Sequence, residues 1–307
     1  AAVTYFLINA VRTPGIFGDL TFDSHGIMAL AASILIYMAV VALGAGTWYV
    51  LLRSIGASVK PRFAASIVFI SQAAKYVPGN VAHHVGRVML ARRHGLGTTA
   101  TLFTMFLEFA WLIGIAAFLT LAYVLTAGSD ELLSWRLDGQ YWMLAILVIL
   151  PLLATFAGHH GVELVATWWA RRRNLELAKV GRPSTAAMVL VSLLYLLSFV
   201  LLGLQLLVIT QQVFSAQAGN LFIFTGIFAA AWVLGFLAPG APAGLGIREV
   251  VLMAALAPIV GKETAICIAA MWLFVSVIGD GLSFLLGLFL SWRLDALRES
   301  LYQAYFV

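Results

Sequence analysis

Long apolar stretches, separated by short polar segments, make up most of the chain. A helix that crosses a membrane needs about 20 consecutive apolar residues. Stretches that approach or exceed this length lie at about 27–52, 98–127, 140–157, 184–212 and 263–291. Residues 1–10 are also apolar but too few to cross, and we expect them to be the end of a further membrane helix. The pattern predicts an all-α polytopic membrane protein with a single transmembrane domain over residues 1–307.

Two further apolar segments are interrupted by a Pro-Gly pair, in the contexts KYVPGN and FLAPGA. The residues at these two breaks are Pro78, Gly79, Pro239 and Gly240. A proline removes a helical hydrogen bond, so each pair predicts a broken helix inside the membrane. An arginine follows nine positions after each proline, at Arg87 and at Arg248. We therefore predict two re-entrant broken hairpins that hold corresponding places in an internal repeat.

The charged residues between the stretches indicate the orientation of the chain. Lysine and arginine are enriched in cytoplasmic loops. Such clusters occur at 53–62, 92–93, 168–182 and 293–298. They predict that the first hairpin opens to the cytoplasm, that the second opens to the outside, and that the C-terminus is cytoplasmic. The duplication is then an inverted repeat, with its first unit at about 1–127, its second at about 140–291 and a C-terminal tail at 292–307.

Composition changes the meaning of the charge. Hydrophobic residues make up 63% of the chain, charged residues 10%, and the formal net charge is +5. In a soluble protein this charge would suggest nucleic acid, but beside membrane helices it favours contact with anionic headgroups of the lipid bilayer. We expect no nucleic-acid partner. The single cysteine, Cys267, lies in an apolar stretch, which excludes a disulfide framework and a thiolate metal site.

Each break would direct the start of a half-helix towards the membrane interior. Unpaired N–H groups and a partial positive charge collect at such a start. Asn80 is a candidate N-cap of the first half-helix, and Gly244 and Gly246 would let the backbone of the second approach a ligand closely. The candidate cations near the breaks are Lys75, Arg87 and Arg248. Together these residues predict a site for a phosphate or phosphodiester group.

Glu108 and Asp280 are carboxylates in the middle of apolar stretches, which is a rare and costly placement. They could neutralise the candidate cations when the site is empty, carry a proton that is coupled to transport, or serve the structure alone. In the competing interpretation the cations bind no ligand. They would then only reach the membrane surface or pair with Glu108, Asp280 and Glu249.

His83 and His84 raise the question of a metal site. Adjacent histidines on a helix point about 100° apart, and no cysteine or carboxylate stands at ligand spacing. We therefore expect no metal or other cofactor, and we expect both histidines to contact a headgroup or to form an interfacial pair. The polar residues inside apolar segments that we expect to connect helices are Ser71, Gln72 and Gln205. The aromatic residues have no regular spacing, and we expect them to face lipid.

The motifs KYVPGN…VGR…ARRHG and PG…GLGIRE resemble those of the lysylphosphatidylglycerol synthase transmembrane-region family. This family includes the flippase domain of the bacterial multiple peptide resistance factor. The resemblance covers nearly the whole chain, but its specific content lies in the two hairpins. By position it implies a functional role for Lys75, Tyr76, Pro78, Gly79, Arg87, Pro239, Gly240, Gly244, Gly246, Arg248 and Glu249.

The resemblance implies a lipid translocase of the bacterial inner membrane. Its cargo would be an anionic phospholipid, an aminoacyl-lipid or a polyprenyl-phosphate-linked sugar. We do not expect an enzyme, because no aminoacyl-transferase domain follows the last span. Two alternatives stay open. One is a membrane-embedded enzyme acting on a lipid headgroup, with His83, His84 and Glu108 as its best candidates. The other is a non-catalytic partner that recruits a glycosyltransferase through residues 168–182.

Overall fold

The computed structural model describes residues 24–76, 82–126, 146, 148–149, 181–216, 219–238, 244 and 246–306. Within these ranges the regular structure is entirely helical. Several predicted features lie outside the described residues, namely Pro78, Gly79, Asn80, Pro239, Gly240, residues 1–10, most of 140–157 and most of 168–182. The described helices are therefore the two flanks of each predicted break.

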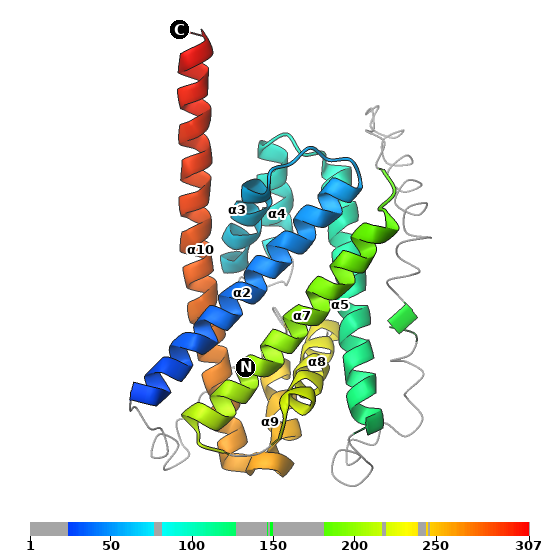
Figure 1. Ribbon diagram of the computed structural model, residues 1–307, viewed down its shortest axis with the longest axis vertical. Helices are drawn as coiled ribbons and strands as arrows, with labels where there is room; N and C mark the ends of the chain where they lie inside the picture. Colours follow the sequence, from blue (N-terminus) through cyan, green and yellow to red (C-terminus); the bar gives the residue numbers. More distant parts are fainter. Residues whose placement is uncertain are drawn as a thin grey trace.

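Four long helices form the body of the molecule: α2 (Ser24–Ser54), α5 (Thr98–Thr126), α7 (Thr185–Val208) and α10 (Lys262–Phe306). The last turn of α7 is continued by a π-helical segment, η2 (Ile209–Val213). By length and composition, four segments are able to cross a membrane, at Ser24–Ser54, Thr98–Thr126, Thr185–Val213 and Lys262–Trp292. These segments confirm four of the predicted spans. Helix α10 continues to Phe306, beyond the predicted end of its span, and projects past the other helices (Figure 1).

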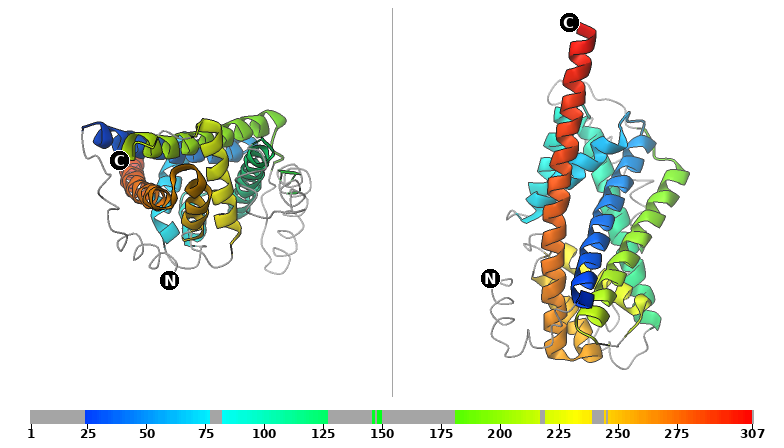
Figure 2. Two further views of the ribbon diagram at one scale, coloured as in Figure 1. Left: turned by 90° about the horizontal axis from the view of Figure 1, so that it is seen from below. Right: turned by 60° about the vertical axis from the view of Figure 1, so that its left-hand side comes forward.

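The long helices alternate in direction. In Figure 1, α2 and α10 run from the lower end of the molecule to the upper end, whereas α5 and α7 run downwards. Helix α10 packs against α3 and α9, and α2 packs against α7 (Figure 2). The first long helix of each half therefore runs opposite to the corresponding helix of the other half.

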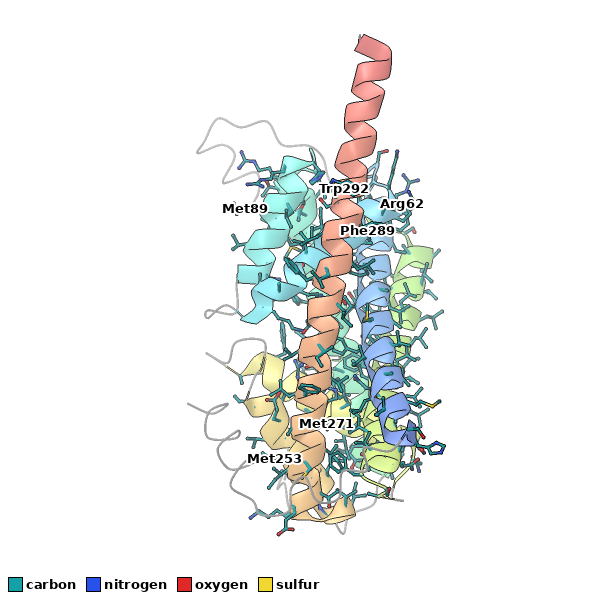
Figure 3. All side chains as sticks on the ribbon, turned by 90° about the vertical axis from the view of Figure 1, so that its left-hand side faces the viewer. Arg62, Met89, Met253, Met271, Phe289 and Trp292 are labelled. Atoms are coloured by element: carbon teal, nitrogen blue, oxygen red, sulfur yellow. The ribbon has the colours of Figure 1, made fainter. Side chains whose placement is uncertain are left out.

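Two pairs of shorter helices lie at opposite ends of this body. The first pair consists of α3 (Pro61–Gln72), its 3-10 extension η1 (Ala73–Tyr76) and α4 (Ala82–Arg93). The second consists of α8 (Leu221–Leu237) and α9 (Ile247–Val260). Figure 3 shows Met89 on α4 and Met253 on α9 towards opposite ends of α10. We call these the upper pair and the lower pair, and their facing ends adjoin the predicted breaks.

Local sequence explains where the short helices begin. Pro61 occupies the first turn of α3, where its missing N–H costs nothing. The side chain of Asn220 accepts a hydrogen bond of 3.1 Å from the Ile223 N–H and caps α8. Gly244 and Gly246 precede α9 with φ angles of +72° and +88°. Because L-residues rarely adopt such angles, the turn that leads into α9 requires glycine at these positions.

The core contains many aromatic residues that we expected to face lipid. Trp48 is 0% exposed and Trp272 is 2% exposed, and the side chains of Phe199, Phe224 and Phe228 are also buried. For these residues the prediction was wrong, because irregular spacing in sequence becomes shared contact when several helices meet. It is right for the outward-facing Phe289 and Trp292, which lie on the surface of α10 (Figure 3).

Gln205 connects three helices, as its place in an apolar span predicted. Its Nε2 donates a hydrogen bond of 3.0 Å to the carbonyl oxygen of Ser33 on α2. Its Oε1 accepts a hydrogen bond of 3.2 Å from the indole Nε1 of Trp272 on α10. Ser71 behaves differently, since its hydroxyl donates to the Val68 carbonyl oxygen within α3. Of these two polar residues, only Gln205 therefore joins separate helices through a described hydrogen bond.

Candidate functional site

Lys75 lies at the inner end of the upper pair and forms a buried network with two long helices. Its ammonium group forms an ion pair with Asp280 on α10. It also donates a hydrogen bond of 2.8 Å to the hydroxyl of Tyr37 on α2, and this hydroxyl donates one of 2.9 Å to Asp280 Oδ1. Asp280 is only 1% exposed. The network therefore holds η1, α2 and α10 together in the interior of the bundle.

Arg87 lies on α4 and pairs with Glu108 on α5, with 2.8 Å between Nη1 and Oε2. The guanidinium group also lies 4.1 Å from the centre of the Trp48 ring, which is a cation–π contact. Arg87 is only 6% exposed, and its Nε and Nη2 have no hydrogen-bond partner among the described residues. A buried guanidinium whose donors are incompletely satisfied is costly, so this group is suited to accept an anionic ligand.

Arg248 occupies the first turn of α9 in the lower pair. Its guanidinium carbon lies 5.5 Å from the centre of the Trp272 ring. A Cβ atom built on Gly235 of α8 would lie 3.3 Å from the Cβ of Arg248, so α8 and α9 approach closely here. The charges of Arg248 and Lys75 are near enough to repel each other. The two helix pairs therefore bring cations from distant parts of the sequence into one region.

Glu249 occupies the start of α9, where the sequence predicted an anionic ligand. Its Oε2 accepts a hydrogen bond of 2.5 Å from the N–H of Gly246, and the side chain is 1% exposed. A Cβ atom on Gly244 would lie 2.9 Å from the carbonyl carbon of Gly235. The two glycines thus serve the turn and its close contact with α8, while the chain's own carboxylate meets the positive end of the helix.

Glu249→Ala should lower the free energy of unfolding by about 1–2 kcal/mol, because α9 loses its buried cap and the charge that its N-terminus favours. Thermal unfolding of the purified protein in detergent measures this effect. Glu263→Ala is the matched control, since Glu263 lies exposed in the first turn of α10. Equal shifts for the two variants would contradict the capping role.

His83 and His84 begin a series of ring contacts that leads from the upper pair to the lower pair. Their ring centres are 3.5 Å apart, and the His84 ring meets Phe109 on α5 edge to face at 4.7 Å. Phe109 in turn stacks on Phe236 of α8 at 5.5 Å. His83 also lies within the influence of the Lys75 and Arg87 charges. Both histidines therefore lie at the edge of the cationic region.

The structure brings together most of the residues predicted for the site. Those it places in or beside the cationic region are Lys75, His83, His84, Arg87, Glu108, Arg248 and Asp280. The predicted pairing of the two intramembrane acids with these cations is confirmed by the two ion pairs. Tyr76 ends η1, but its side chain lies outside the described ones. Sequence reasoning missed Tyr37, Trp48 and Trp272, since nothing distinguishes a bridging aromatic residue inside an apolar span.

Comparison with known proteins adds an independent finding. The family model described as "Lysylphosphatidylglycerol synthase TM region" matches residues 19–283. No curated protein matches the chain. The matched range contains both helix pairs and every residue of the cationic region described above. Because the match spans most of the chain, the protein belongs to the lysylphosphatidylglycerol synthase TM region family and is a multi-pass helical membrane protein.

Proposed function

We propose that this protein is a translocase that moves a lipid with an anionic headgroup between the leaflets of the bacterial inner membrane. Its C-terminus would lie in the cytoplasm. The observation that carries the proposal is the convergence of Lys75, Arg87 and Arg248 inside a bundle of membrane helices. Charges at such a depth are expensive, and in membrane proteins they usually mark the path of a substrate or an ion.

The arrangement of the helices supports a transport role. The upper and lower pairs lie at opposite ends of the bundle, and the long helices beside them run in opposite directions (Figure 1). In our proposal the two pairs are the re-entrant hairpins of an inverted repeat. Transporters built in this way bind their cargo near the membrane centre, where discontinuous helices meet. The headgroup would then lie between the facing ends of the pairs while its tails stay in lipid.

The two ion pairs suggest how the empty site is kept stable. Glu108 and Asp280 neutralise Arg87 and Lys75 in the absence of cargo. A phosphate entering the site would compete with both carboxylates for the same cations. Each exchange replaces one charge-assisted contact by another, so the headgroup need not leave an uncompensated charge behind. This balance allows the cargo to bind and also to depart.

Transport by Arg87→Gln and Arg248→Gln variants in proteoliposomes tests the proposal. We expect both to reduce the transfer of fluorescent phosphatidylglycerol to the rate of protein-free vesicles, because the phosphate loses a guanidinium contact. Arg53→Gln is the control, since Arg53 lies exposed at the end of α2. Gel filtration checks that each variant remains folded. Transfer at the wild-type rate by both site variants would refute the assignment.

A further inference from the structure

A continuous series of aromatic rings joins the upper and lower pairs. We call His83, His84, Phe109, Phe236 and Trp232 the aromatic ladder. The last step of this ladder is the closest to parallel, with Phe236 and Trp232 at 5.1 Å and an interplanar angle of 7°. None of its five side chains is fully buried. The ladder therefore differs from core residues such as Phe228, whose ring is enclosed on all sides.

The ladder lies along the cationic region. At one end, His83 is within reach of the charges of Lys75 and Arg87. At the other end, Phe236 follows Gly235, which packs against Arg248. A ligand whose phosphate is held by these cations would thus have aromatic rings beside it. The group attached to that phosphate determines whether these rings contribute to binding.

Two kinds of headgroup favour aromatic rings, namely an ammonium group and a sugar. Ammonium groups are attracted to ring faces but also need a carboxylate nearby. The described acids of this region already face positive groups: Glu108 pairs with Arg87, Asp280 pairs with Lys75, and Glu249 accepts from the N–H of Gly246. An incoming ammonium would meet three cations and would be repelled.

A neutral sugar has no such conflict. The C–H groups on one side of a pyranose ring carry partial positive charge, which the negative face of an aromatic ring attracts. Its hydroxyl groups need polar partners, and the Nδ1 atoms of His83 and His84 are buried without a hydrogen-bond partner among the described residues. An imidazole nitrogen can donate to a hydroxyl or accept from one, according to its tautomer.

We infer that the ladder is a sugar-binding surface and that the cargo is a neutral sugar joined to its lipid through phosphate. This inference rests on the proposed translocase and names its substrate class. The phosphate would bind Lys75, Arg87 and Arg248, and the sugar would lie against Phe109 and Phe236 with its hydroxyls towards the histidines. An aminoacyl-lipid, which carries additional positive charge, would bind poorly at this site.

Equilibrium binding to the full-length protein in detergent tests the inference with three probes: farnesyl phosphate, mannosyl-phosphoryl-farnesol and lysylphosphatidylglycerol. We expect the mannosyl lipid to bind about tenfold more tightly than farnesyl phosphate, in line with the value of one good ring contact, and the lysyl lipid to bind most weakly. Phe236→Leu keeps apolar volume but removes the ring face. It should bring the affinity for the mannosyl lipid down to that for farnesyl phosphate and leave the latter unchanged.

Phe63→Leu is the matched control, because the Phe63 ring contacts His94 in the upper pair, away from the ladder. It should alter the affinity for neither farnesyl probe. Equal binding of the two farnesyl probes by the wild-type protein, or strongest binding of the lysyl lipid, would overturn the sugar assignment while leaving the translocase proposal intact. These wild-type comparisons need no variant to fold. If none of the three probes binds, the sugar assignment and the proposed function both fail.

Discussion

Asp280→Ala should lower the free energy of unfolding by about 3–5 kcal/mol, since it leaves the Lys75 ammonium in the interior without its carboxylate. Asp280 is 1% exposed and accepts from both Lys75 and Tyr37, so no water replaces it at low cost. Lys75→Ala should cost less than Asp280→Ala, because Lys75 is the more exposed partner at 18%. Chemical unfolding in detergent micelles, followed by far-UV circular dichroism, measures both effects.

The combined variant Lys75→Met with Asp280→Leu is the control for this prediction. Replacing both partners of a buried ion pair by apolar residues of similar size is often nearly neutral. We therefore expect the double variant to be closer to wild type than Asp280→Ala alone. Strictly additive losses would show that the two side chains do not interact, and the network with Tyr37 would have to be abandoned.

Gly203→Ala should also destabilise the protein strongly, by about 3 kcal/mol, which is the upper end of the range for overpacking. A Cβ atom at this position would lie 2.6 Å from the Cα and 2.7 Å from the backbone nitrogen of Thr225. Because the obstacle is backbone of α8, no side-chain rotation relieves the clash, and α7 must move away from α8. Small residues at helix contacts commonly allow such close approach in membranes.

Gly46→Ala provides the comparison for this substitution. Gly46 lies inside α2, and a Cβ atom there would meet nothing within 4 Å. The change should be neutral or should stabilise the protein by up to about 1 kcal/mol, owing to the better helix propensity of alanine. Thermal unfolding in one detergent gives both values. Equal stability of the two variants would mean that α7 and α8 are not packed as closely as the structure shows.

The membrane spans were predictable because the bilayer imposes a simple length requirement. Their ends agree with the sequence prediction to within three residues, for example at Thr98–Thr126. The short helices beside the breaks were predicted as well, since Pro-Gly pairs interrupt a helix wherever it is placed. The extension of α10 to Phe306 was not predicted, because positive charge after the span indicates where the membrane ends but not whether the helix stops.

The candidate site was predictable in its charges but not in its contacts. Lys75, Arg87 and Arg248 stand out because charge is rare in this chain. Which acid meets which cation depends on the packing of helices far apart in sequence, so the pairing of Lys75 with Asp280 could be proposed only among alternatives. The aromatic ladder was missed for the same reason. Its rings come from three different helices, and no spacing within any one of them reveals it.

The contact between Gly279 and Tyr37 limits how the molecule is able to change shape. A Cβ atom at Gly279 would lie 2.4 Å from a ring carbon of Tyr37, so α2 and α10 touch at this depth with no side chain of residue 279 between them. These two helices therefore form one rigid wall. The inner ends of the upper and lower pairs meet that wall through ion pairs and ring contacts, which exchange partners far more easily than close-packed backbone. Access for a lipid would thus alternate through hinged shutters in a fixed frame, and not through the rocking of one half of the protein against the other.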